Sequence, residues 1–432
     1  MLYGLIGEHL THSYSCEIHS KIADYDYKLT ELKPEAVGTF LEKRDFKAIN
    51  VTIPYKETVK PYLDFISDTA RAVGAVNTVV NRDGKLYGYN TDFAGMSAMF
   101  NKYGIELKNK KVMILGTGGT CKTAFAVAKA MGAREIIKVS RSGACGSITY
   151  DEAVGAHTDT EIIINTTPVG MFSRQGGKPI ELSPFPRLTG VVDAIYNPLR
   201  TELVSEAMKR GIPACGGLYM LAAQAVYASA LFLDKEADGE LIDKAYSAVE
   251  AEKENIVLVG MPSSGKSTVG KTVSERLGRE FIDSDSEIIK IIGMSISDYF
   301  EKNGEKAFRE VEKEVIVELS KKSGCVIATG GGAVLDAENV MRLRQNGRIY
   351  FLDRDLQNLI FTSDRPLASS YEALEKRYKE RYPIYRACCD FAVNGNGSVA
   401  TVAEDIINKH NERIWRESSV TAVIEDFTRK FP

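Results

Sequence analysis

One octapeptide, GMPSSGKS at positions 260–267, constrains the fold of this chain more than any other feature. It matches the pattern GxxxxGK[ST], it follows a strand-like run over 256–259, and a helix-like run over 268–277 comes after it. In this order, a strand, a glycine-rich loop and a helix form a P-loop, whose successive backbone N–H groups surround phosphate. The octapeptide therefore predicts an ATP-binding α/β domain with a parallel sheet.

The side chains around this loop suggest separate roles. We expect Lys266 to contact the β- and γ-phosphates and Ser267 to bind Mg²⁺. After the predicted helix comes an acidic pair, in which Asp283 can bind the metal while Asp285 accepts a hydrogen bond from the hydroxyl that receives the phosphoryl group. The residues predicted to bind the nucleotide are Gly260, Ser263, Ser264, Gly265, Lys266, Ser267 and Thr268.

A second glycine-rich turn, GTGG at 116–119, lies in the first half of the chain. A short strand is expected over 112–115 and a helix over 120–131, which is the order of a dinucleotide-binding Rossmann unit. The next strand, 136–139, ends at Ser-Arg-Ser, where an NAD enzyme usually carries an acid. An arginine can bind the ribose 2′-phosphate that NADP carries and NAD lacks, so NADP(H) is favoured over NAD(H) as the cofactor. The predicted cofactor-binding residues are Gly116, Gly118, Gly119, Ser140, Arg141 and Ser142.

Strand-like and helix-like runs alternate along the whole chain, which predicts α/β domains with largely parallel sheets. A polar, helix-prone segment over 234–255 looks like a spacer, and a second break falls near 107–111. We therefore expect a substrate-binding domain over 1–106 and a Rossmann domain over 107–250 whose last helices return to the first domain. A P-loop domain over 251–419 and a tail over 420–432, to which no role is assigned, complete the expected organisation.

Composition excludes some classes of function. The formal net charge is −3 and no basic cluster is present, so we expect no nucleic-acid partner. No run of about 18 apolar residues suggests a membrane span. Seven cysteines without a CxxC pair indicate reduced thiols and a cytoplasmic protein, and the neighbours Cys388 and Cys389 are expected to be small apolar fillers near a helix end. Small molecules are the expected partners, and a homo-oligomer is possible.

Seven motifs of the first half, in this order, resemble shikimate dehydrogenases over about residues 1–245: HLTHSYSCEIHS, NVTIPYKETV, GAVNTVV, GYNTDFAG, INTTPVGM, DAIYNPLRTELV and GGLYMLAAQ. The resemblance implies that Lys56 polarises a ketone and supplies the proton, and that Asp92 keeps Lys56 charged and orients the substrate. It also implies a set of substrate-binding residues, namely Ser13, Ser15, Thr52, Asn77, Tyr196 and Gln224. Three positions depart from the family pattern: Cys16, Ser140 and Lys122.

The second half resembles shikimate kinases over about residues 255–410, through NGE with FREVE, a GGG turn, RPL and RYPIY. The resemblance implies a fold like that of nucleoside-monophosphate kinases and a carboxylate-binding cage formed by Arg309, Arg381, Gly331 and Gly332, with Glu312 orienting Arg309. It assigns to Arg365 a mobile lid that closes over the phosphates and assists catalysis. The segment 358–364 lacks an arginine that many relatives carry, and Ala387 and Cys389 also depart from the pattern.

Together, the two resemblances imply a bifunctional enzyme of aromatic amino acid biosynthesis. Its first half would reduce 3-dehydroshikimate to shikimate with NADPH, and its second would phosphorylate shikimate with ATP and Mg²⁺ to shikimate 3-phosphate. One alternative is a quinate or other hydroxy-acid dehydrogenase joined to a different small-molecule P-loop kinase. Another is that one half is a non-catalytic binding module, which the presence of all the expected catalytic residues disfavours.

Overall fold

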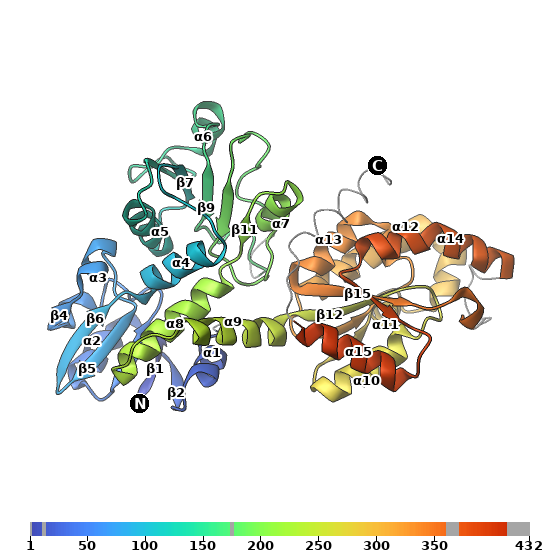
Figure 1. Cartoon of the computed structure of the whole chain (residues 1–432), viewed down its shortest axis with the longest axis horizontal. Helices are drawn as coiled ribbons and strands as arrows, with labels where there is room; N and C mark the ends of the chain where they lie inside the picture. The colour runs from blue at the N-terminus through green and yellow to red at the C-terminus, as the bar shows by residue number, and fades with distance from the viewer. Residues whose placement is uncertain (1, 11–13, 173–176, 360–370, 413–432) are drawn as a thin grey trace. The chain divides into compact units, whose positions relative to one another are not determined.

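The computed structural model describes residues 2–10, 14–172, 177–359 and 371–412. The chain divides into two compact units (Figure 1). The first comprises residues 1–207 and 212–250, and the second comprises residues 208–211 and the chain from residue 251 onward. The three sheets formed by the described residues alternate with helices, as the alternation of strand-like and helix-like runs predicts.

The first unit begins with a six-stranded mixed sheet in the order β2-β1-β3-β5-β6-β4. Strands β5 and β6 are antiparallel and form a hairpin whose turn, Asp83-Gly84, has positive φ at both residues. Such a turn matches the twist of the two strands. The strands are β1 (Tyr3–Gly7), β2 (Tyr27–Glu31), β3 (Ala48–Val51), β4 (Phe65–Ile66), β5 (Thr78–Arg82) and β6 (Lys85–Tyr89), with helices α1 (Ser15–Ile22), α2 (Val37–Lys43), α3 (Asp68–Val73) and α4 (Thr91–Lys102).

A second sheet in the same unit has five parallel strands in the order β11-β10-β9-β7-β8. Every residue of β7, β9 and β10 is buried, as expected of parallel strands covered by helices on both faces. The strands are β7 (Lys111–Leu115), β8 (Glu135–Val139), β9 (Ile162–Asn165), β10 (Gly190–Asp193) and β11 (Ala214–Cys215), and the helices that alternate with them are α5 (Gly119–Ala130), α6 (Tyr150–Ala156) and α7 (Glu202–Lys209).

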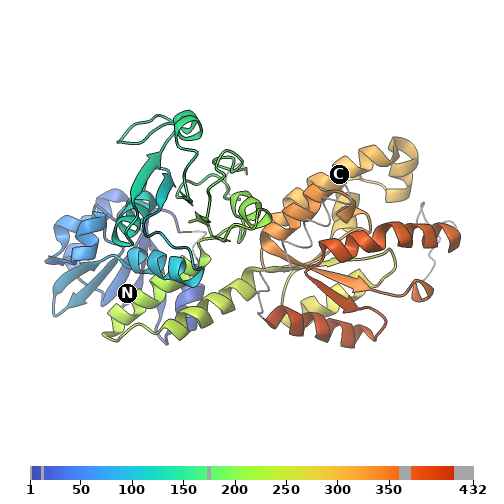
Figure 2. The same ribbon diagram turned by 45° about the horizontal axis from the view of Figure 1, so that its top comes forward.

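Helix α8 (Leu218–Leu233) connects the second sheet back to the first. It lies alongside α4 in both views (Figures 1 and 2). The close approach depends on Gly95 of α4, where an added Cβ would lie 2.7 Å from the carbonyl oxygen of Met220. At the far end of α8, the ring of Phe232 stacks on Tyr3 of β1 with centroids 5.6 Å apart. Helix α8 therefore packs against both α4 and the first sheet.

The segment over 234–255 is not the spacer that its composition suggests. Most of it forms helix α9 (Gly239–Lys253), which buries Ile242, Ala245 and Val249. These three residues, spaced at three and four positions, lie on one face of the helix. The remaining positions are largely polar, and most of them are half-buried, so the average composition of the segment conceals its packed face. The helix is therefore largely a structural part of the first unit.

The second unit contains five parallel strands in the order β13-β14-β12-β15-β16. The P-loop strand lies at the centre of this order, and all five of its residues are buried. The strands are β12 (Asn255–Val259), β13 (Phe281–Asp283), β14 (Val326–Ala328), β15 (Gly347–Asp353) and β16 (Phe391–Asn394). The helices are α10 (Lys266–Leu277), α11 (Ser284–Ile292), α12 (Ile296–Ser320), α13 (Ala337–Asn346), α14 (Tyr371–Cys388) and α15 (Val399–Asn411).

Most elements predicted from sequence agree with the structure to within one or two residues. The strands expected over 112–115 and 136–139 correspond to β7 and β8, each of which begins one residue earlier. Helix α10 begins two residues earlier than predicted, so that Lys266 and Ser267 lie in its first turn.

All seven cysteines are free. Helix α14 ends at Cys388, and burial raises the pKa of Cys388 to about 12 and that of Cys389 to about 11. Because the thiolate is the reactive form, a raised pKa lowers the reactivity of both thiols at neutral pH. This agrees with the interpretation of the pair as small apolar fillers.

Candidate active sites

An ion pair joins the two residues expected to catalyse reduction. Lys56 lies in the segment after β3, and Asp92 is the second residue of α4. The Lys56 Nζ lies 2.6 Å from Asp92 Oδ2, and the side chains are 26% and 14% exposed. Asn90 fixes the start of α4, because its side chain accepts a hydrogen bond from the Phe93 N–H and donates one to the Ala75 carbonyl. The pair is thus a partly buried charge pair on a well-anchored helix end.

Asn77 and Gln224, two residues predicted to bind substrate, both form hydrogen bonds with Thr91, which is next to Asp92 of this ion pair. Asn77 Oδ1 accepts a hydrogen bond from the backbone N–H of Thr91 at 2.7 Å, and Asn77 Nδ2 donates to Thr91 Oγ1 at 3.1 Å. The same hydroxyl donates to Gln224 Oε1 of α8 at 3.4 Å. Thr91, which directly precedes Asp92, was not identified from sequence, although it lies in the GYNTDFAG motif. The structure therefore brings Asn77 and Gln224 to the start of α4.

The other predicted substrate residues lie at strand and helix ends. Ser15 is the first residue of α1 and is buried, and Thr52 follows β3 directly. The ring of Tyr196 lies 5.1 Å from that of Tyr14, so Tyr196 comes close to the start of α1. Ser13 is outside the described residues. Tyr196, although it lies in the loop between β10 and α7 of the second sheet's domain, therefore lies near residues of the first domain.

A buried carboxylate anchors the loop that carries Tyr196. Asp193, the last residue of β10, accepts hydrogen bonds from the Ile195 N–H, from Thr201 Oγ1 and from Asn165 Nδ2, at 3.0, 2.7 and 3.0 Å. Burial raises the pKa of Asp193 to about 6, and the three hydrogen bonds oppose that rise. These contacts connect the INTTPVGM and DAIYNPLRTELV motifs and hold the loop against the second sheet.

The predicted cofactor loop has room for a closely approaching phosphate. Gly116 has a φ of +106°, and an added Cβ there would lie 2.9 Å from Thr166 Oγ1, so glycine is needed. At Gly118 and Gly119, by contrast, an added Cβ would face open space at the N-terminus of α5. An exposed helix N-terminus with bare backbone suits a pyrophosphate. The loop therefore fits the pyrophosphate of a dinucleotide.

The three residues expected to select NADP follow the neighbouring strand β8. Ser140 Oγ lies 2.7 Å from Ser147 Oγ, and the Ser140 N–H donates to the carbonyl of Ile148. The next two residues, Arg141 and Ser142, are exposed. Because β7 and β8 are adjacent and parallel, their carboxyl ends meet at one edge of the sheet, so Arg141 emerges beside the glycine loop. This placement fits a 2′-phosphate.

One further ion pair joins the cofactor helix to the catalytic segment. Lys122 Nζ, in the first turn of α5, lies 2.6 Å from Glu57 Oε1, and Glu57 directly follows Lys56. The hydrogen bond from Lys122 lowers the pKa of Glu57. Sequence reasoning singled out Lys122 only as a departure from the family pattern and missed Glu57. An isolated glutamate beside a lysine carries no signal in the sequence.

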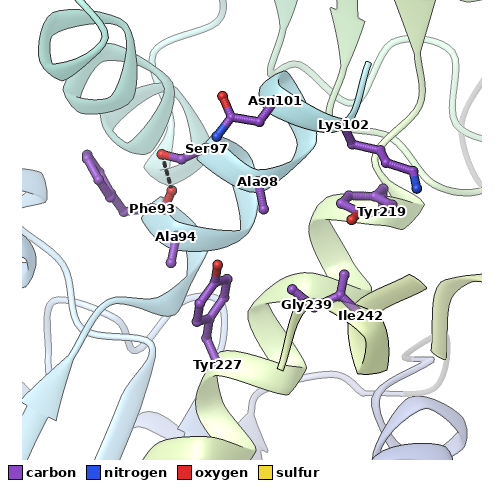
Figure 3. A pocket seen from close by; sticks show the side chains of 10 residues that line it. All are labelled: Phe93, Ala94, Ser97, Ala98, Asn101, Lys102, Tyr219, Tyr227, Gly239 and Ile242. Atoms are coloured by element: carbon purple, nitrogen blue, oxygen red, sulfur yellow. Dashed lines mark hydrogen bonds between the residues drawn. The ribbon is translucent and has the colours of Figure 1, made fainter. Parts of the chain in front are cut away.

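A hollow of about 480 Å³ lies beside α4, α8 and the start of α9 (Figure 3). Its walls include Phe93, Tyr219, Tyr227 and Ile242. The residues that line it are distinct from the predicted substrate and cofactor residues, although Phe93 is the neighbour of Asp92. Neither Lys56 nor Asp92 lines the hollow.

In the second unit, the P-loop lysine is folded back onto its own loop. Lys266 Nζ donates hydrogen bonds to the carbonyl oxygens of Gly260 and Met261, both at 2.9 Å. The hydroxyl of Ser264 is buried and has no hydrogen-bond partner among the described residues. A buried hydroxyl without a partner is costly in isolation, so its presence in this loop fits a ligand with acceptor oxygens. The loop is thus suited to a nucleotide phosphate.

The two residues predicted to bind Mg²⁺ are in direct contact. Ser267 Oγ donates to Asp283 Oδ2 at 2.6 Å. The other oxygen of Asp283 accepts hydrogen bonds from the backbone N–H groups of Asp285 and Ser286 and so caps helix α11. A hydroxyl and a carboxylate are hard oxygen donors of the kind that Mg²⁺ prefers, with water and phosphate completing its shell. The donor set therefore fits this metal.

The residues of the expected carboxylate cage are also brought together. Arg309 Nη1 lies 2.6 Å from Glu312 Oε2, and Arg309 Nη2 lies 3.0 Å from Glu305 Oε1. Burial raises the pKa of Glu312, whereas Arg309 opposes that rise. Arg381 Nη1 donates to the carbonyl of Gly331 at 3.0 Å. Glu312 therefore holds Arg309 in place, as the resemblance implies.

The GGG turn approaches this cage so closely that side chains would not fit. An added Cβ at Gly330 would lie 2.5 Å from Asp285 Oδ1 and 3.2 Å from Glu312 Oε1. At Gly332 it would lie 2.3 Å from Arg309 Nη1. Asp285, Arg309 and Arg381 thus converge on one turn at the end of β14. Arg365 is outside the described residues.

These two sites define a class of protein. The first unit has the fold and the charged pair of a dinucleotide-dependent reductase, and the second has the fold and loop of a small-molecule P-loop kinase.

Among the helices of the described residues, none is long and apolar enough to cross a membrane.

Comparison with known proteins identifies the family. The model of the shikimate dehydrogenase substrate-binding domain matches residues 5–79, and the model of shikimate kinase matches residues 262–411. A shikimate dehydrogenase (NADP(+)) of Clostridium beijerinckii is 37% identical over 265 residues, which are 58% of this chain and 98% of that protein. The chain therefore belongs to the shikimate dehydrogenase family, and a shikimate kinase domain follows in the same polypeptide. It is a bifunctional enzyme of the shikimate pathway.

Solved structures agree with this assignment. The first unit is similar to the crystal structure of a chorismate mutase/shikimate 5-dehydrogenase fusion protein from Clostridium acetobutylicum, with a TM-score of 0.55 and 34% identity over 57% of this chain and 96% of that one. It is also similar to shikimate 5-dehydrogenase from Thermus thermophilus in complex with NADP(H) and shikimate, with a TM-score of 0.51 and 28% identity over 57% of this chain and 99% of that one.

Proposed function

We propose that the first unit reduces 3-dehydroshikimate to shikimate with NADPH and that the second phosphorylates shikimate to shikimate 3-phosphate with ATP and Mg²⁺. The observation that carries the proposal is that each unit brings its own charged site together. The first contains the Lys56 and Asp92 pair, and the second contains Arg309, held by Glu312, near a complete P-loop. The product of the first reaction is the substrate of the second.

In the reduction, NADPH supplies the hydride, so the protein must stabilise the developing alkoxide and deliver a proton. The Lys56 ammonium is suited to both tasks, because it carries a positive charge and protons that it can donate. Asp92 accepts a hydrogen bond from it at 2.6 Å and so orients the ammonium. Asn77 and Gln224, which meet at Thr91, would then bind the ring hydroxyls of the substrate.

In the phosphorylation, ATP supplies the phosphoryl group, and the protein positions the acceptor hydroxyl. Asp285 lies next to the cage and would accept the hydrogen bond of that hydroxyl. Arg309 and Arg381 would bind the planar carboxylate of shikimate, which two guanidinium groups suit well. Lys266 would exchange its bonds to the Gly260 and Met261 carbonyls for bonds to phosphate oxygens.

The proposal is tested by separating the two reactions. Lys56→Ala should abolish reduction of 3-dehydroshikimate and leave phosphorylation of shikimate near normal, whereas Lys266→Ala should do the reverse. Each variant is the control of the other, and circular dichroism with a melting curve shows whether both remain folded. If either folded variant lost both activities, the assignment of one site to each unit would be wrong. Quinate as an alternative substrate of the Lys266→Ala variant measures the breadth of the dehydrogenase site.

A further inference from the structure

One arginine of the second unit lies beside the P-loop and has no place in the roles described above. Arg354 directly follows β15, and β15 pairs with the P-loop strand β12, with Phe351 opposite Val259. An added Cβ at Gly265, the residue before the P-loop lysine, would lie 3.6 Å from Arg354 Nη1. The guanidinium therefore faces the backbone of the phosphate-binding loop.

The base of this side chain is held by its own loop. Arg354 Nε donates a hydrogen bond to the carbonyl of Asn358 at 3.0 Å. The Asn396 Oδ1 accepts hydrogen bonds from the Asp355 N–H at 3.1 Å and from Asn358 Nδ2 at 2.8 Å, which ties the loop after β15 to the loop after β16. The contact with Asn358 uses the Nε end of the guanidinium. Nη1 is the end that points to the P-loop.

Glycine at position 395 makes this arrangement possible. An added Cβ at Gly395 would lie 3.2 Å from Cβ of Arg354, which is tighter than an ordinary contact. The loop after β16 therefore comes close to the stem of the arginine. Arg354 is only partly exposed as a result, and its stem lies between two loops at the carboxyl ends of β15 and β16.

The charge of Arg354 is not cancelled locally. Among the residues that the structure describes, no carboxylate oxygen lies within 4 Å of its guanidinium, and its hydrogen bond goes to a neutral carbonyl. The preceding acid, Asp353, accepts a hydrogen bond from the hydroxyl of Tyr382 at 2.9 Å. A guanidinium that faces a phosphate-binding loop without a paired acid is suited to phosphate oxygens, because its N–H groups match their geometry.

We propose that Arg354 is a nucleotide-binding residue of the kinase, and that its guanidinium contacts the phosphate chain of ATP from the β15 side of the P-loop. The inference rests on the proposed function of the second unit. It adds a second cation to the site beside Lys266. It also supplies positive charge from the end of β15. The segment 358–364, which in many relatives carries an additional arginine, contains none in this chain.

Binding of ADP to the full-length protein tests this proposal directly, because it needs no turnover. Arg354→Met removes the charge and keeps an unbranched apolar stem, and we expect the Kd for ADP, measured by titration calorimetry, to rise about ten-fold or more. Arg354→Lys should recover part of the loss. Arg276→Met is the matched control, because Arg276 forms an exposed ion pair with Glu404 in the last turn of α10, and it should bind ADP as the unaltered protein does.

Adenosine distinguishes a phosphate contact from a general disturbance of the site. We expect Arg354→Met to leave adenosine binding nearly unchanged, and to raise the KM for ATP without raising the KM for shikimate. Unchanged ADP affinity, or equal losses for ADP and adenosine, would overturn the assignment. If Arg354→Met failed to fold, Arg354→Lys and Arg354→Gln would be compared by the same titrations, and equal affinities for ADP would also overturn it. A protein that binds ADP through Arg354 but does not phosphorylate shikimate would contradict the proposed function alone.

Discussion

Replacing Gly332 by alanine tests whether the Arg309 guanidinium lies where a bound carboxylate needs it. An added Cβ at Gly332 would lie 2.3 Å from Nη1, 2.5 Å from Nη2 and 2.7 Å from Cζ of Arg309. All three distances are well below van der Waals contact. The backbone at Gly332 has φ −106° and ψ −8°, which is open to alanine. The substitution therefore acts by displacing the guanidinium and does not strain the backbone.

The size of the effect follows from the contacts of Arg309. The displaced guanidinium would lose its position beside Glu312, which it contacts at 2.6 Å, and with it the geometry for binding a carboxylate. A hydrogen bond to a charged group contributes about 1.5–3 kcal/mol. The KM for shikimate should therefore rise about ten- to hundred-fold. Because Glu312 is buried and would lose its charged partner, the melting temperature should also fall.

The assay is steady-state phosphorylation with shikimate and ATP varied in turn. We expect the KM for ATP and the dehydrogenase activity of the same Gly332→Ala chain to remain near normal, which shows that the protein is folded. Gly397→Ala is the matched control, because an added Cβ there makes only ordinary contacts at 3.7 Å and beyond. An unchanged KM for shikimate in folded Gly332→Ala would refute the placement of Arg309 in the substrate site.

Arg141→Asp should weaken NADPH far more than NADH in fluorescence titrations, because the substitution removes a cation from the proposed 2′-phosphate site and adds a repelling charge; equal losses would contradict that role. Since burial raises the pKa of Glu312 above 4.5, this carboxylate takes up a proton at a higher pH than an exposed glutamate does. The KM for shikimate in the kinase assay should thus begin to rise before the pH falls to 4.5, and Glu312→Gln should show a raised KM without that dependence. Because the proposal gives each unit its own substrate site, unlabelled shikimate added to a coupled reaction should dilute label from 3-dehydroshikimate in proportion; label that resists dilution would show direct transfer.

The parts of the fold predicted best from sequence are those set by local patterns. The P-loop and the glycine turn after β7 each combine a buried strand, glycines at fixed positions and a helix, so a few neighbouring residues determine the structure. The burial of α9 was not predicted. Its buried face, Ile242, Ala245 and Val249, is defined by what packs against it, and only the tertiary structure shows that.

The candidate sites were predicted as sets of residues, but most of their contacts were not. Thr91 and Gln224 are 133 positions apart in the sequence, and no local pattern shows that they share a hydrogen bond. Arg354 likewise looks like a surface charge at the end of a strand. It becomes a candidate for phosphate binding only because the pairing of β15 with β12 places it beside Gly265.

The most direct test of the account is a single coupled reaction. Purified protein is incubated with 3-dehydroshikimate, NADPH, ATP and Mg²⁺, while NADPH absorbance and shikimate 3-phosphate are followed together. We predict that NADPH is consumed, that shikimate 3-phosphate appears after a lag, and that the two amounts become equal at completion. Loss of NADPH without phosphorylated product, or phosphorylation only of added shikimate, would contradict the claim that this one chain catalyses both steps.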